Sequence, residues 1–306
     1  MRILRFLTTG LAALLFLPIN LDKGGAPERV ASSGDRPLRC VLSLGESSGY
    51  LTGFNYELLK SFGESQGSPV SIILGEKGGA YSDSLLLDSL DVVVIAASAF
   101  GKSKGTSAVS LGDTSVVWGL RDDIAAEAVR WFARFKGTGR YKSMENRFFH
   151  MGPSTISPYD DLFRKSAGIV GWDWRLLAAL AWSESRFLIQ ARSPKGALGI
   201  MQMMPVTADR FGLTDALDPE ENITAAARYL AFLKNMLRPY TDDPEALAWL
   251  TIAAYNSGGG RALQDLEGRE RSSATEAYTE ATLNRYDIYR GLPPRYQNIG
   301  QETIEP

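Results

Sequence analysis

The chain has 306 residues, of which 44% are hydrophobic and 22% are charged, and its formal net charge at pH 7 is −2. This length allows two ordinary domains, the composition is that of a globular protein, and the balanced charge gives no indication of a nucleic-acid partner. The single cysteine, Cys40, excludes an internal disulfide and the single histidine, His150, excludes a multi-histidine metal site, so we expect no metal and no cofactor and look to carboxylates for chemistry.

The first elements along the chain are an apolar leader and a polar linker. Arg2 and Arg5 precede "FLTTGLAALLFLP", which is too short to span a bilayer and has the length of a signal-peptide core. Residues 1–20 are therefore predicted to be a signal peptide, with a short uncleaved anchor or a buried first helix as the alternatives. Residues 21–37, rich in Gly, Pro, Ser and charge, are predicted to be a linker.

Residues 38–150 carry the pattern of an α/β domain. The segments "LRCVLSL", "VSIIL" and "DVVVIAAS" are typical of short buried strands, and "GFNYELLKSFGESQG" between the first two has apolar residues at helical spacing. This β-α-β order predicts a mostly parallel sheet. A further strand in "TSVVWGLR" and helices in "DIAAEAVRWFARFKGTG" and "YKSMENRFF" complete the predicted domain.

The segment "LTGFNYELLKSF" resembles the first helix of the bacterial extracellular solute-binding proteins of the amino-acid-binding type. In that family the chain crosses to a second lobe and the ligand lies between the lobes. Here only "AFGKSKGTSAVSLGD" is available for the crossing, which is too short to build a lobe. We therefore expect a single-lobe, periplasmic-binding-protein-like domain, and two interpretations stay open: a scaffold that docks a protein partner, and a sensor of a small ligand.

A second linker and a helical domain complete the chain. Residues 151–158 contain two prolines that flank Ser and Thr, as in a domain linker. Residues 159–306 have helical spacing in successive segments from "DLFRKSAGIVG" to "SATEAYTEATLNRYDIYRG". The predicted fold class is therefore α+β with two domains, an α/β domain followed by an all-α domain.

Glu184 lies inside the apolar face of a predicted helix. On a helical wheel of "DWRLLAALAWSES" it falls between Leu177 and Leu180. Partial burial and the negative end of the helix dipole both favour the protonated carboxyl group. Such a group can donate a proton near neutral pH, whereas the alternative is a glutamate in a fraying last turn that turns to water.

Two further segments contain residues suited to binding. In "SPKGALGIMQMMPVTA", Gly196 and Gly199 let the backbone pass close to a ligand, and the Gln202 amide suits sugar hydroxyls or an acetamido group. In "AAYNSGGGR", Tyr255 and Asn256 end an apolar helix that glycines stop. Taken singly, each of these has an ordinary explanation as a turn or a helix cap.

Together, "ESRF", "SPKGALGIMQMMPVTA" and "AYNSG" resemble the signature of the lytic transglycosylases of the soluble-lytic-transglycosylase type, which have a lysozyme-like fold and act on peptidoglycan. The resemblance covers residues 159–289. With the solute-binding domain ahead of it, the architecture resembles that of membrane-bound lytic transglycosylase F with a shortened sensor half. The resemblance implies peptidoglycan glycan strands as the substrate and a periplasmic location, with peripheral association to the outer membrane left open.

The resemblance also carries site residues onto this chain. Glu184 takes the position of the family's catalytic acid and base. Tyr286, in "TLNRY", is matched to a tyrosine that faces the catalytic glutamate, although the spacing in "EATLNRY" departs from that of the family. The positions expected to line the cleft or bind the substrate are Ser185, Gly199, Met201, Gln202, Tyr255, Asn256 and Tyr286.

In the mechanism that the family implies, Glu184 protonates the oxygen that bridges N-acetylmuramic acid and N-acetylglucosamine. It then takes the proton from the muramyl 6-hydroxyl, which closes a 1,6-anhydro ring. No second carboxylate is required, and no acidic residue lies between Glu184 and Asp209. The alternatives are a goose-type, lysozyme-like hydrolysis with Asp209, Asp215 or Asp218 positioning a water, and a regulatory muropeptide-binding protein without turnover.

Overall fold

The structure is a computed structural model. It describes most of the chain after the leader, namely residues 36–45, 48–75, 81, 84–85, 89–101, 104–111, 115–266 and 272–296. The predicted signal peptide and nearly all of the predicted first linker lie outside these residues. None of the helices in these ranges is long and apolar enough to cross a membrane.

The first part of the chain forms a five-stranded sheet in the order β2-β1-β3-β5-β4. Its strands are β1 (Leu38–Ser43), β2 (Val70–Leu74), β3 (Val92–Ala96), β4 (Thr106–Val109) and β5 (Val116–Arg121). The parallel pairing that we predicted holds for β1 with β2 and with β3. The sheet is not mostly parallel, because β5 runs antiparallel to β3 and to β4. The connection from β4 to β5 is too short for the crossover that parallel strands need.

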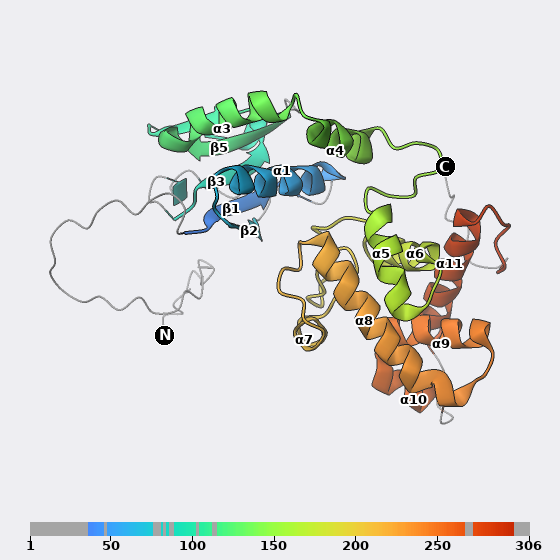
Figure 1. Ribbon diagram of the computed structural model, residues 1–306. Coiled ribbons are helices and arrows are strands. Elements are labelled where there is room, and N and C mark those ends of the chain that lie inside the picture. Colours follow the sequence, from blue (N-terminus) through green and yellow to red (C-terminus); the bar gives the residue numbers. More distant parts are fainter. Residues whose placement is uncertain are drawn as a thin grey trace, which may run out of the picture.

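Three helices accompany this sheet: α1 (Leu51–Ser65) and α3 (Asp122–Phe135) pack on one face of it, and α4 (Gly139–Phe149) lies beyond the sheet and packs against α1 (Figure 1). A short 3₁₀ turn, η2 (Ala97–Ala99), follows β3. Alternate residues of the strands point into this layer, and the buried Trp118 of β5 donates a hydrogen bond from Nε1 to Asn55 Oδ1 of α1 at 2.9 Å. We call the part from β1 to α4 the N-terminal unit. It has one sheet layer, but its likeness to solute-binding proteins stays a prediction.

The rest of the described chain is helical, as we predicted. Its helices are α5 (Asp160–Val170), α6 (Trp174–Ser185), α7 (Pro205–Arg210), α8 (Pro219–Leu237), η3 (Arg238–Tyr240), α9 (Pro244–Ser257), α10 (Gly259–Leu266) and α11 (Ser273–Tyr289). We call this part the helical unit. Helix α6 is its centre, since residues 176–181 are all buried, and it packs between α5 and α11. The fold is therefore α+β.

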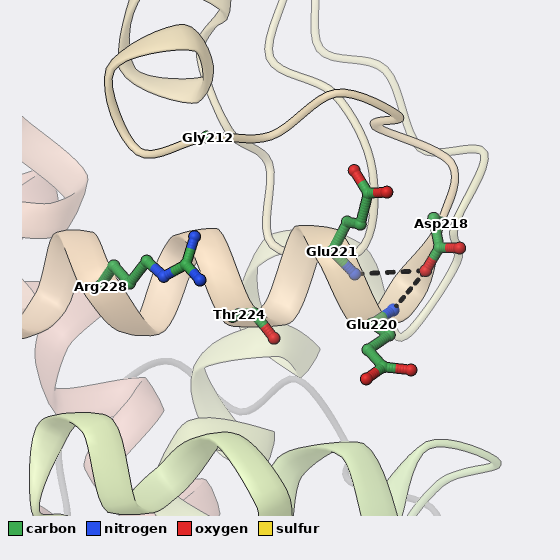
Figure 2. Close-up of a pocket in the computed structure, with 6 residues that line it drawn as sticks. All are labelled: Gly212, Asp218, Glu220, Glu221, Thr224 and Arg228. Carbon is green, nitrogen blue, oxygen red and sulfur yellow. Dashed lines mark hydrogen bonds between the residues drawn. The ribbon is translucent and has the colours of Figure 1, made fainter.

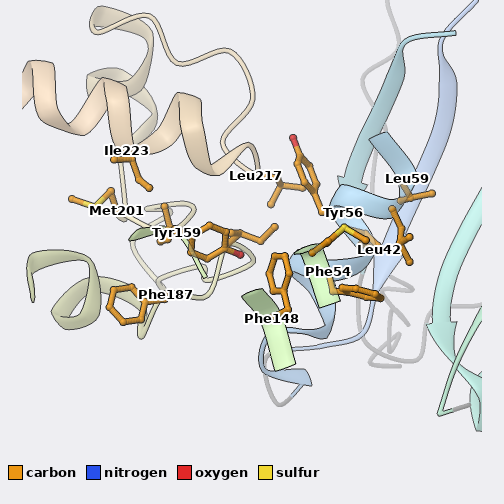
Figure 3. Close-up of a cluster of buried hydrophobic side chains, with 14 of the residues drawn as sticks. Leu42, Phe54, Tyr56, Leu59, Phe148, Tyr159, Phe187, Met201, Leu217 and Ile223 are labelled. Carbon is orange, nitrogen blue, oxygen red and sulfur yellow. The ribbon is translucent and has the colours of Figure 1, made fainter. Parts of the chain in front are cut away.

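The two units share one continuous hydrophobic core (Figure 3). Tyr159, which precedes α5, is 2% exposed and meets Phe148 of α4 edge-to-face at 5.9 Å between ring centroids. Tyr159 also packs directly on the backbone of α1 at Gly53, where a Cβ would lie 2.4 Å from Tyr159 Oη. The predicted domain boundary near residue 150 is therefore crossed by well-packed side chains, and α1 lies against the helical unit.

Candidate active site

Glu184 lies in the last turn of α6 and is partly buried. Burial raises the pKa of its carboxyl group to about 7, and a hydrogen bond donated by Tyr278 Oη to Glu184 Oε1 opposes this rise. Burial raises the pKa of Tyr278 well above its ordinary value, and the negative charge of Glu184 adds to the effect. A glutamate with this pKa is present both as acid and as base near neutral pH.

The backbone directly after Glu184 takes an unusual path. Arg186 and Phe187 have φ values of 55° and 64°, in the left-handed region that non-glycine residues seldom adopt. Two such residues in succession store strain, and the buried ring of Phe187 holds the turn in place. Ser185 is buried and donates to the carbonyl oxygens of Ala181, at 3.2 Å, and of Ile200, at 2.6 Å. Ser185 thus ties the end of α6 to the next loop.

That loop, residues 198–203, is organised by Asn222 of α8, which is fully buried. Its Oδ1 accepts a hydrogen bond from the Met201 amide at 2.9 Å, and its Nδ2 donates to the carbonyl oxygens of Ala216, at 3.0 Å, and of Leu198, at 3.3 Å. The sequence analysis missed Asn222, because its partners are backbone atoms between 6 and 24 residues earlier along the chain. Met201 is itself fully buried, so it supports the loop through its backbone and through packing.

Gly199 has a different role from the predicted one. Its φ is +79°, and a Cβ on it would lie 2.3 Å both from the Ala216 carbonyl oxygen and from Asn222 Nδ2. The close approach that glycine permits here is to α8 and the loop before it, and its predicted place beside a substrate stays a prediction. Gly196, with φ +87° and open space around it, is an ordinary turn residue.

Gln202 and Tyr255 hold this loop in place, and Tyr255 also lies near Glu184. Gln202 adopts a left-handed conformation and donates both amide hydrogens to backbone carbonyls, those of Ala191 at 3.0 Å and Gly199 at 2.9 Å. Its Oε1 is left as an acceptor for a ligand. Tyr255 Oη donates to the Met201 carbonyl at 2.7 Å. Burial raises the pKa of Tyr255 well above its ordinary value, and the nearby charge of Glu184 contributes to the rise.

The prediction that Tyr286 faces Glu184 is wrong. The phenol of Tyr286 contacts Asp173 Oδ2 at 3.5 Å, at the beginning of α6, whereas Glu184 lies at the end of that helix. Helix α11 runs antiparallel to α6, so the tyrosine near Glu184 is Tyr278, eight residues or about 12 Å earlier. Tyr278 lies on the same face of α11 as the buried threonines Thr275, Thr279 and Thr282. Their helical spacing was the signal in the sequence that could have placed Tyr278 on the inner face of this helix.

Asn256 lies at the end of α9 with an exposed side chain, and its Oδ1 accepts a hydrogen bond from Thr275 Oγ1 of α11 at 3.4 Å. It remains a candidate ligand contact at the end of the helix that carries Tyr255. Of the predicted residues, Tyr255 lies near Glu184 and is bonded to the Met201 carbonyl, Gln202 is held in the same loop as Met201, and Ser185 is bonded to the carbonyl of Ile200 in that loop.

The aspartates considered in the sequence have contacts or exposure of their own. Asp215 and Asp218 both accept hydrogen bonds from Tyr56 of α1, and Asp209 is exposed on α7. Across the described ranges, no group of three or more His, Cys, Asp or Glu side chains is placed to hold a metal ion.

The packing of Gly199 gives a prediction with a matched control. We expect Gly199→Ala to lower the free energy of unfolding about 2 kcal/mol more than Gly196→Ala does. Both substitutions place an alanine at positive φ, but only the Cβ at residue 199 collides with backbone and with Asn222. Denaturant unfolding of the two variants measures the difference, and equal losses would contradict the assigned packing.

Comparisons with known proteins agree with the sequence resemblance. Residues 161–278 match the family described as the transglycosylase SLT domain. A membrane-bound lytic murein transglycosylase F from Thiobacillus denitrificans is 41% identical over 108 residues, 35% of this chain and 23% of the relative. One from Yersinia pseudotuberculosis is 40% identical over 126 residues, 41% of this chain and 25% of the relative. These matches confirm the resemblance to lytic transglycosylases inferred from the three motifs.

Each match covers about a quarter of the length of these curated relatives. Among solved structures, the 70 kDa soluble lytic transglycosylase from Escherichia coli is 23% identical, with a TM-score of 0.38, over 53% of this chain and 30% of that one.

Proposed function

We propose that this protein is a peptidoglycan lytic transglycosylase. It cleaves the β-1,4 bond between N-acetylmuramic acid and N-acetylglucosamine without water and leaves 1,6-anhydro ends. The observation that carries the proposal is a single glutamate, Glu184, whose pKa burial raises to about 7 beside Tyr278, within a segment that matches the transglycosylase SLT domain.

Glu184 acts first as the acid. Because Tyr278 Oη donates to Oε1, that oxygen behaves as the carbonyl oxygen of the protonated carboxyl, and the proton resides on Oε2. Glu184 passes this proton to the bridging oxygen as the bond from that oxygen to the muramyl anomeric carbon breaks. The carbonyl oxygen of the muramyl acetamido group stabilises the positive charge that develops on the anomeric carbon.

Glu184 then acts as the base. The ionised carboxylate takes the proton of the muramyl 6-hydroxyl while the oxygen of that hydroxyl bonds to the anomeric carbon. This bond closes the anhydro ring, and the proton transfer regenerates the acid. Since the attacking hydroxyl belongs to the substrate, its effective concentration is high and no second carboxylate is required. This distinguishes the reaction from two-carboxylate glycoside hydrolysis.

The neighbours of Glu184 divide into two groups in this proposal. Gln202, through Oε1, and Asn256, through its exposed amide, contact the sugar and its acetamido group. Tyr255 and the buried Met201 keep the loop in position, since the tyrosine hydroxyl is already bonded to the Met201 carbonyl. Preorganised donors and acceptors of this kind lower the barrier because they need no reorganisation during the reaction.

The nature of the product tests this function. We expect digestion of purified sacculi by the full chain to release anhydromuropeptides, each lighter by one water molecule than the hydrolysed muropeptide. Mass spectrometry of the soluble products separates the two. Muropeptides with reducing ends would instead establish hydrolysis, and intact sacculi would favour a binding protein without turnover.

The location follows from the substrate. A peptidoglycan-cleaving enzyme with the signal peptide predicted for residues 1–20 belongs in the periplasm, and the relatives from Thiobacillus and Yersinia are named as membrane-bound. Peripheral contact with the outer membrane stays an open part of the proposal. The two interpretations of the N-terminal unit, a docking scaffold and a sensor of a small ligand, also stay open.

A further inference from the structure

Besides the contact of Gly53 with Tyr159, α1 and the turn before it make polar contacts with the helical unit at two places. In this turn, the Gly49 carbonyl accepts a hydrogen bond from Gln190 Nε2 at 3.2 Å. Further along, Tyr56 Oη donates to Asp215 Oδ2 at 2.9 Å, and Lys60 Nζ pairs with Asp218 Oδ2 at 2.5 Å. The two contacts lie on either side, in sequence, of the loop at residues 198–203.

The first contact leads directly to this loop. Gln190 is 6% exposed and is followed by Ala191. The carbonyl of Ala191 accepts hydrogen bonds from the Gly199 amide and from Gln202 Nε2, both at 3.0 Å. Fixing Gln190 against α1 therefore fixes the carbonyl on which Gln202 is oriented.

The second contact reaches the same loop through the segment that begins α8. Asp218 caps this helix, its Oδ1 accepting hydrogen bonds from the amides of Glu220 and Glu221 at 2.9 Å and 3.2 Å (Figure 2). Its other oxygen accepts from Lys60. Asn222, which holds the Met201 amide, lies in the first turn after this cap.

The carboxylate of Asp218 is thereby shared between the two units. Burial acts to raise its pKa, but the hydrogen bonds from Lys60 and from the α8 amides outweigh burial and hold the pKa below its ordinary value. Tyr56, only 2% exposed, adds a hydrogen bond to the same oxygen at 3.3 Å. Its ring packs in the shared core with Leu217 nearby (Figure 3).

Backbone packing completes this second connection. The carbonyl of Ala216, a residue between Asp215 and Asp218, accepts a hydrogen bond from Asn222 Nδ2 at 3.0 Å. The same carbonyl packs against the Cα of Gly199, where a side chain would collide with it. A displacement of this segment would therefore move both the Asn222 amide and the Gly199 turn. The contacts of Gln190, Tyr56 and Asn222 are partly buried, where losing a partner is more costly than at the surface, whereas the Lys60–Asp218 pair lies at the surface.

We propose that Tyr56 and Lys60 are positioning residues for the active site: α1 and the turn before it clamp both flanks of the loop at residues 198–203, which Tyr255 connects to Glu184. The N-terminal unit is in this respect a fixed part of the enzyme, even where no ligand is bound to it. The kinetic consequence rests on the proposed function, whereas the mechanical consequence, a less ordered loop when the clamp is removed, does not.

The test is a Tyr56→Phe/Lys60→Met double variant of the full chain, which keeps the ring and the apolar stem but removes the polar contacts. We expect amide hydrogen exchange at residues 198–203 to accelerate about tenfold or more, with kcat for anhydromuropeptide release lower by about tenfold to a hundredfold and KM within about twofold. Exchange in the core of α8 around Leu230 should stay unchanged, which separates local loosening from global destabilisation.

The matched control is Arg140→Met, which removes an exposed ion pair with Glu64 at 2.7 Å inside the N-terminal unit. It should leave exchange at residues 198–203 as in the wild type. If the double variant folds poorly, Tyr56→Phe alone, which removes the partly buried contact with Asp215 and keeps the ring, is compared with the control instead. Exchange in the loop equal to that of the control would overturn the clamp. A looser loop in a chain whose wild type makes no anhydro product would support the clamp and reject the proposed function.

Discussion

The Glu184→Gln variant is expected to release anhydromuropeptides from sacculi at least about 10⁴-fold more slowly than the wild type, since acid and base catalysis are both lost. Glutamine has nearly the same shape as glutamate, and its Oε1 can still accept the hydrogen bond of Tyr278. It has no proton to give to the bridging oxygen and no basic oxygen to take one from the 6-hydroxyl. Quantified product release by mass spectrometry measures the loss.

The variant should remain folded, and its stability provides a second readout. Because burial raises the pKa of Glu184 from 4.5 to about 7, the folded wild type holds a proton between these pH values that the unfolded chain has released. Wild-type stability therefore falls as pH rises through this window, by about 3 kcal/mol in total. Glutamine does not ionise, so Glu184→Gln should be more stable than the wild type at pH 8, and this advantage should vanish near pH 4.

A matched control is Glu245→Gln, which neutralises an exposed glutamate at the opposite end of α9 from Tyr255. It should release product at the wild-type rate and show no comparable gain in stability. Anhydromuropeptide release by Glu184→Gln at a rate close to that of the wild type would reject Glu184 as the acid and base.

The sequence located Glu184 because the evidence for it is local. Its place within an apolar helical face depends only on residues a turn away, and the motif that follows is continuous along the chain. The helical class of the second part was predictable for the same reason. The β4–β5 hairpin was not predictable in this way, since β4 lies inside the segment that we interpreted as the connection toward a second lobe.

The partners of the active-site loop could not be predicted in this way. Asn222, Tyr56 and Lys60 are polar residues on amphipathic helices, and nothing in their spacing shows that they face another segment. Tyr278 and Tyr286 lie on the same helix, and the choice between them depends on how α11 is aligned against α6. Such alignment is a tertiary property that periodicity does not contain.

The pH dependence of catalysis tests the Tyr278 assignment. We expect kcat/KM to fall about tenfold per pH unit above pH 7, because Glu184 must be protonated to act as the acid and its pKa is about 7. Burial raises this pKa and the Tyr278 hydrogen bond lowers it. Tyr278→Phe should therefore move the descending limb of the kcat/KM profile to higher pH, in addition to any loss of rate.

Tyr286→Phe is the matched control, since it removes the same hydroxyl from the same helix but at the contact with Asp173. Its descending limb should coincide with that of the wild type. The comparison depends on the position of the limb and not on its height, so a general loss of activity in either variant does not obscure it. A limb that moves in Tyr286→Phe and stays in place in Tyr278→Phe would show that α11 is aligned differently against α6, with Tyr286 as the partner of Glu184.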